Sequence, residues 1–182
     1  IPDRDDQTGS LRHGDELARP DQAALGVLPA HQGFEADDLP RIQAHLRLDD
    51  LDADVRLVDG RFSEAPSAGQ ATGGLDVTLL LEESGDLDGD DMPDAVIAVA
   101  ADTGGSGRWV YLAPYLADDA RPDPIPALLL GDRVQVKTLT VRDGRLTANL
   151  VVPGPNDPMC CPSKAESRDY VLDATGALVA AP

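Results

Sequence analysis

The chain has 182 residues and a formal net charge of −18, from 33 acidic and 15 basic residues. This length suits one domain with an extension, and the charge excludes nucleic acid as an expected partner, because phosphate binding requires a basic surface. The longest apolar run, 95–101, is far shorter than the roughly 20 residues that cross a bilayer, so we expect no membrane span.

The acidic residues are mostly aspartate, and lysine is scarce. Salt screens repulsion among such charges, with a Debye length of about 3 Å at 1 M. We therefore expect a halophilic or salt-tolerant source. The alternative is a generally acidic protein from a GC-rich genome.

Residues 1–40 are polar, are interrupted by prolines and show no sustained hydrophobic period. We interpret them as an N-terminal extension or arm. The pattern changes at Arg41, and residues 41–182 are expected to form one β domain.

Strand patterns follow one another along this domain. Apolar residues alternate from Ile42 to Leu48, and two Asp-Gly pairs, Asp59-Gly60 and Asp143-Gly144, lie between apolar segments and predict hairpins. The remaining predicted strands are 75–83, 94–102, 108–117, 167–173 and 177–180.

About nine short strands with little helical period predict a mainly β fold, an antiparallel sandwich or a barrel-like structure. Pro126 directly precedes residues 127–132 and can begin a helix, so one short helix in this segment is an alternative.

The most informative segment is the acidic stretch that begins at Asp86. Counting Asp86 as position 1, acids recur at positions 3, 5 and 9, and position 7 is Met92. Calcium takes six to eight oxygen ligands, which alternating carboxylates and a backbone carbonyl supply. We expect a structural calcium ion whose ligands are Asp86, Asp88, Asp90, Asp94 and the carbonyl of Met92.

This stretch resembles the DxDxDGxxD calcium loops that lie between strands in FG-GAP-type repeats. It differs at position 6, where Asp91 replaces glycine, although aspartate tolerates the left-handed conformation better than most residues. We expect a weak affinity, roughly 10⁻⁴–10⁻³ M. The alternative is a solvated acidic turn in a chain rich in aspartate.

Cys160 and Cys161 are adjacent and are the only cysteines. Consecutive α-carbons lie about 3.8 Å apart, which is below the usual 4.4–6.8 Å of bridged cysteines. Three readings are open: a vicinal disulfide that stiffens a proline-rich loop, two unbridged thiols that pack, or a soft-metal or redox site with Met159.

Three segments in this order resemble a recurring bacterial envelope domain of lipoprotein type. They are GDLDGDDMPDAVIAVAADTGGSGRWVYLAPYL, LLLGDRVQVKTLTVRDGRL and GPNDPMCCPSKAESRDYVL. The resemblance implies a periplasmic or extracellular location, lipid anchoring in some members, and an occasional association with modules similar to lysozyme inhibitors. The chain also begins at Ile1 rather than Met, as an exported and processed product would.

These observations predict a non-catalytic exported module that binds or inhibits a partner, with a basic envelope or extracellular protein as the expected partner. Two rival hypotheses are a metal-dependent hydrolase that uses the acidic loop, with a pocket beside Asp88 and Asp90, and a thiol-redox protein that uses Cys160 and Cys161.

Overall fold

The computed structural model describes residues 43–66, 68, 73–117 and 124–182, so the arm predicted at 1–40 lies outside the described residues. The described residues form strands and one 3-10 turn, η1 (Asp49–Leu51). The strands are β1 (Ala44–Leu48), β2 (Ala53–Leu57), β3 (Arg61–Glu64), β4 (Leu75–Gly85), β5 (Asp94–Asp102), β6 (Arg108–Tyr115), β7 (Ile125–Pro126), β8 (Leu128–Asp132), β9 (Gln135–Arg142), β10 (Arg145–Val152), β11 (Lys164–Leu172) and β12 (Leu178–Ala180).

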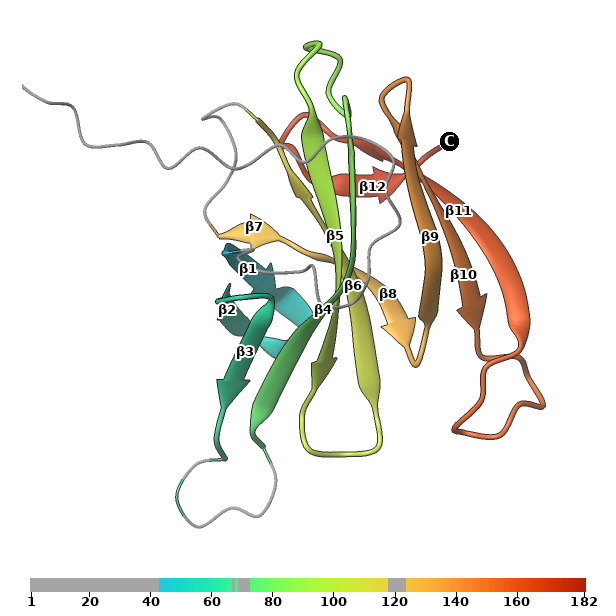
Figure 1. Cartoon of the computed structure of the whole chain (residues 1–182). Coiled ribbons are helices and arrows are strands. Elements are labelled where there is room, and N and C mark those ends of the chain that lie inside the picture. Colours follow the sequence, from blue (N-terminus) through green and yellow to red (C-terminus); the bar gives the residue numbers. More distant parts are fainter. Residues whose placement is uncertain (1–42, 67, 69–72, 118–123) are drawn as a thin grey trace, which may run out of the picture.

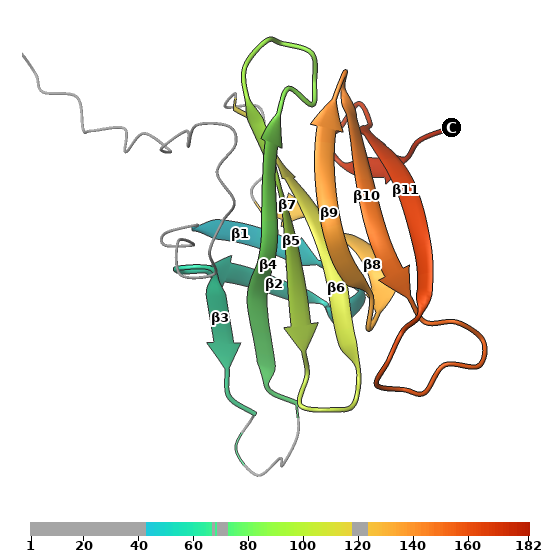
Figure 2. The ribbon, with the colours of Figure 1, turned by 45° about the vertical axis from the view of Figure 1, so that its right-hand side comes forward.

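The strands assemble into three sheets, with a five-stranded sheet of order β3-β4-β5-β6-β8 in the centre (Figure 1). A four-stranded sheet, β12-β11-β10-β9, lies against one face of the central sheet, and a small sheet, β2-β1-β7, lies against the other (Figure 2). The prediction of a mainly β fold is confirmed, and the described strands form open sheets rather than a closed barrel.

The composition of β5 explains why the central sheet is covered on both faces. Alternate residues of a strand point to opposite faces, and in β5 both sets are apolar. Val96, Ala98 and Ala100 belong to the core beneath the four-stranded sheet. The residues between and after them, 97, 99 and 101, belong to the core beneath the small sheet. A strand buried on both faces reads as a continuous apolar run.

Strand β4 changes its inward face at a bulge. Its register against β5 shifts between Leu79 and Leu81. Leu79 packs in the core beneath the small sheet, whereas Leu80 and Leu81 pack against the core beneath the four-stranded sheet. The extra residue of a bulge reorients the side chains that follow it, so the end of β4 faces the four-stranded sheet.

The two Asp-Gly pairs have different outcomes. Asp143 and Gly144 have φ angles of 51° and 70° and join β9 to β10 as an antiparallel hairpin, as predicted. Asp59 and Gly60 form a similar turn, but only the bridge between Val58 and Arg61 closes it. Strand β2 pairs with β1 and strand β3 pairs with β4, so the chain passes here from the small sheet to the central sheet. The predicted tight turn therefore forms, but its flanking strands do not pair with each other as a hairpin.

The short helix considered as an alternative for residues 127–132 is also absent. Residues 128–132 form β8, which pairs with β6 at the edge of the central sheet, and Leu130 is buried in the core. Sheet pairing and burial override the local helical pattern here. Among the residues that the structure describes, no helix has the length and apolar character needed to cross a membrane.

Candidate functional site

The acidic loop, residues 86–93, connects β4 to β5 at one end of the central sheet, beside the β9–β10 turn (Figures 1 and 2). Gly85 and Asp94 are the last pair of the β4–β5 ladder. Leu87, between the first two acids, is only 2% exposed and belongs to the core beneath the four-stranded sheet. The loop is therefore anchored by an apolar side chain as well as by its strands.

The close approach of β4 to β9 requires glycine at position 85. A Cβ atom built there would lie 2.7 Å from the Cβ of Val141 and 2.8 Å from its Cγ1. Real Cβ atoms essentially never come so close. Gly85 thus allows the start of the loop to lie directly against the four-stranded sheet.

Asp94 is the buried acid of the site, at 2% exposure. Its Oδ2 accepts hydrogen bonds from the backbone N–H of Leu87 at 2.7 Å and of Asp88 at 3.3 Å. Its Oδ1 accepts one from the N–H of Ala117 at 3.0 Å, beyond the end of β6. This carboxylate therefore ties the acidic loop to the segment that follows β6.

Three carboxylates converge at the acidic loop, two from the loop itself and one from the first residue of β5. Oxygen atoms of Asp86, Asp88 and Asp94 lie within 4.8 Å of one another. Asp86 accepts from the N–H of Gly89 at 2.7 Å and of Asp91 at 3.2 Å, and Asp88 accepts from the N–H of Asp90 at 3.1 Å. A carboxylate offers about four lone-pair positions, so oxygen lone pairs remain for a cation.

Asp90, the fourth predicted carboxylate, lies outside this group of three. It is exposed, and its Oδ1 accepts a hydrogen bond from the N–H of Met92 at 2.7 Å. The structure thus brings three of the four predicted carboxylates together.

Asp91, which departs from the calcium-loop pattern, has a φ angle of 67°. This is the left-handed region in which the pattern usually has glycine, and aspartate is among the residues that adopt it most readily. The substitution of aspartate for glycine is therefore compatible with the turn.

A depression of about 620 Å³ lies beside the loop. Leu87, Asp88 and Gly89 line it together with the β9–β10 turn at 143–144 and with residues 171–176, which are the end of β11 and the turn that follows it. Asp90 is not among its lining residues. The prediction missed this juxtaposition because the three turns are far apart in the sequence.

Asp173 organises the β11–β12 turn at the rim of this depression. Its Oδ1 accepts hydrogen bonds from the N–H and Oγ1 of Thr175 and from the N–H of Ala177, and these bonds lower the pKa of its carboxyl. A carboxylate stabilised in this way keeps its negative charge beside the depression.

The proline-rich loop at 153–163 lies at the opposite end of the fold from the acidic loop (Figure 1). Cys160 and Cys161 form a disulfide there, with their α-carbons 3.8 Å apart. Of the three readings, the vicinal disulfide is therefore the state of this structure. Hydrogen bonds from the N–H of Gly154 and from Ser163 lower the pKa of the nearby Asp157 carboxyl.

Comparison with protein-family models found no match, and neither the curated proteins nor the solved structures gave a significant match.

Proposed function

We propose that this protein is a non-catalytic exported envelope module. Its acidic loop holds one structural calcium ion, and its acidic surface binds or inhibits a basic partner protein. The observation that carries the ion site is the convergence of Asp86, Asp88 and Asp94. The resemblance of three sequence segments to an envelope domain supports the proposed location.

Mutual repulsion of the carboxylates supports a bound cation. Two unit charges 4.8 Å apart repel by about 1 kcal/mol in water and by about 3–4 kcal/mol at an effective dielectric constant of 20. A divalent cation among the three oxygens replaces this repulsion by attraction. Because every donor in the group is a carboxylate oxygen, the chemistry favours a hard ion such as calcium.

The ion has a structural role in this proposal. The hydrogen bond from the N–H of Leu87 to Asp94 joins the two ends of the acidic loop, and the buried side chain of Leu87 anchors the loop in the core. Neutralising the carboxylates would hold the loop against the β9–β10 turn without requiring any chemical step. Asp90 and the carbonyl of Met92 would complete the ligand set on the exposed side.

The distribution of charge supports a basic partner and indicates which part of the molecule it contacts. The segment that forms β1 to β8 carries far more acids than bases. The last four strands and their loops carry equal numbers: Lys137, Arg142, Arg145, Lys164 and Arg168 against Asp143, Asp157, Glu166, Asp169 and Asp173. A basic protein is therefore attracted chiefly to the central and small sheets.

We expect about 10 mM calcium, compared with a chelator, to raise the melting temperature of the wild type by about 3–10 °C in high salt. This range follows from mass action at the expected affinity and from the usual entropy of unfolding for this size. Asp88→Asn should abolish the increase, because the amide keeps an oxygen that can accept from Asp90 N–H but loses the charge. Differential scanning calorimetry measures both.

The matched control for this experiment is Asp143→Asn. Asp143 lines the same depression and has a φ angle of 51°, which asparagine tolerates, but it is not among the converging carboxylates. Its calcium response should equal that of the wild type. A wild type whose melting temperature is the same in calcium and in chelator would refute the ion site.

Binding of a basic partner should depend strongly on salt. With a lysozyme-type enzyme as the probe, we expect inhibition or binding at about 10 mM salt and its loss at about 1 M, because the Debye length falls from about 30 Å to about 3 Å. Surface plasmon resonance and a cell-wall lysis assay measure the two effects. Neither binding nor inhibition at low salt would reject this class of partner.

The depression beside Asp88 favours a second candidate, a metal-dependent hydrolase whose cation faces a substrate there. A hydrolase of this kind should hydrolyse a chromogenic ester or phosphate. The hydrolysis should depend on added metal, and Asp88→Asn should abolish it. The module proposal expects the wild type to show none.

A further inference from the structure

The loop at 153–163 exposes a disulfide that the proposed function does not use. It connects β10 to β11 at the end of the fold away from the acidic loop (Figure 2). Cys160 and Cys161 are both exposed, and the preceding residue, Met159, is 65% exposed. A thiol in solution therefore has direct access to the pair.

This disulfide is a poor structural cross-link. A cross-link stabilises a fold chiefly by restricting the unfolded chain, and the effect grows with the number of residues that it encloses. Cys160 and Cys161 are neighbours in the sequence, so their bond encloses no intervening residue. The bond therefore acts on the local loop and not on the stability of the whole fold.

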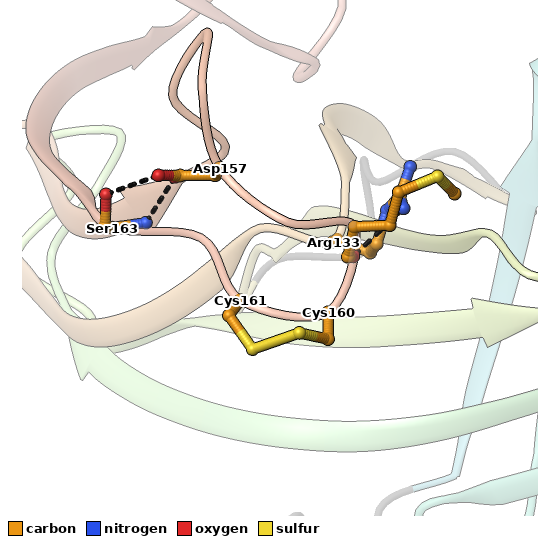
Figure 3. Close-up of a disulfide and its surroundings, with 6 residues drawn as sticks. Arg133, Asp157, Cys160, Cys161 and Ser163 are labelled. Atoms are coloured by element: carbon orange, nitrogen blue, oxygen red, sulfur yellow. Dashed lines mark hydrogen bonds between the residues drawn. A yellow bond between two sulfur atoms is a disulfide. The ribbon is translucent and has the colours of Figure 1, made fainter.

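The loop is held in place by contacts that involve neither sulfur atom (Figure 3). Asp157 accepts hydrogen bonds at 2.7 Å from the N–H of Gly154 and from both the N–H and the Oγ of Ser163. At the tip, Nη1 of Arg133 donates to the carbonyl oxygen of Met159 at 3.0 Å.

A turn inside the loop adds a further contact, from the N–H of Cys161 to the carbonyl oxygen of Pro158 at 3.0 Å. All of these bonds can persist after reduction, because none uses a cysteine side chain. The two thiols would then stay side by side, ready to close again.

We propose that Cys160 and Cys161 form a reversible thiol–disulfide exchange site whose reaction partner is a dithiol. One thiolate of the dithiol attacks a sulfur of the pair, forms a mixed disulfide and releases the other cysteine as a thiolate, which takes a proton. The second thiolate of the dithiol then attacks the other dithiol sulfur, which is bonded to the protein in the mixed disulfide, and releases the remaining cysteine. Two electrons pass to the protein, and the dithiol leaves as a cyclic disulfide.

The adjacency of the cysteines selects a dithiol over a monothiol. After attack by a monothiol, the released cysteine lies beside the mixed disulfide at a very high effective concentration. It closes the protein disulfide again and expels the monothiol. A dithiol avoids this reversal because its second thiol completes the exchange.

The test uses the full folded chain, with dithiothreitol as the dithiol and glutathione as the monothiol at equal thiol concentration. After rapid alkylation, intact mass should show two alkyl groups with dithiothreitol, and neither alkyl groups nor a glutathione adduct with glutathione. The melting temperature of the reduced protein should lie within about 2 °C of that of the oxidised protein, because the disulfide affects only the local loop. Alkylation that requires urea, or equal reduction by the monothiol, would overturn the proposal.

The Cys160→Ser variant provides a second experiment. It tests whether the remaining sulfur is accessible when no neighbouring thiol can re-form the protein disulfide. The remaining Cys161 should take up one glutathione from oxidised glutathione and retain it, because no neighbouring thiol can expel it. Its melting temperature should also lie within about 2 °C of the wild type. Failure to form the adduct would show that the sulfur is inaccessible, and a large fall in melting temperature would show a structural cross-link; either result overturns the proposal.

Discussion

Asp94→Ala is expected to lower the free energy of unfolding by about 3 kcal/mol or more, because it leaves backbone donors without an acceptor. Asp94 is 2% exposed and accepts from the N–H groups of Leu87, Asp88 and Ala117. Leu87 is itself buried, so water cannot readily replace the lost bond. Urea denaturation in the presence of a chelator measures this effect separately from ion binding.

Asp76→Ala is the control for this prediction, since it removes an exposed carboxylate from β4 of the same sheet. It should change the free energy of unfolding by no more than about 0.5 kcal/mol. Asp94→Asn should fall between the two, because an amide has one accepting oxygen and its NH₂ group opposes a backbone donor. A urea midpoint for Asp94→Ala equal to that of the wild type would contradict the anchoring role of this carboxylate.

Gly85→Ala is expected to lower the free energy of unfolding by about 1–3 kcal/mol through overpacking. The added methyl group would lie 2.7 Å from the Cβ of Val141, and relieving this contact must move β4 away from β9. For a chain of this size, the melting temperature should fall by about 2–4 °C per kcal/mol. Thermal unfolding followed by circular dichroism measures the shift.

Gly105→Ala is the matched control, because a Cβ atom at that position meets nothing within 4 Å. Its backbone also avoids the left-handed region, so alanine introduces no strain there. We expect its melting temperature to equal that of the wild type or to exceed it slightly. Equal midpoints for Gly85→Ala and Gly105→Ala would show that the two sheets do not pack as closely as the structure has them.

Local patterns were sufficient to predict most of the strands and the position of the acidic loop. The Asp143-Gly144 hairpin followed from turn chemistry alone, because both residues accept the positive φ angles that a tight hairpin requires. The spacing of the acids after Gly85 also placed them on one turn between two strands, and three of them do converge.

Local patterns did not predict which strands pair, because pairing depends on contacts between segments that are distant in the sequence. The turn at Asp59-Gly60 has the same local chemistry as Asp143-Gly144, yet its flanking strands join different sheets. Residues 128–132 form a strand because the edge of β6 was open to pair with them. Neither outcome is encoded in a window of ten residues.

Composition, hydrophobic period and residue spacing are local properties, so the sequence was sufficient to predict an acidic, mainly β chain and to locate the candidate ion loop and the adjacent cysteines. The coverage of the central sheet on both faces, the burial of Leu87 and Asp94 and the support of the disulfide loop by Arg133 became visible only in the folded chain. Burial and hydrogen bonding at these positions involve partners from other strands and turns, and a linear pattern does not contain the distance or direction of those partners.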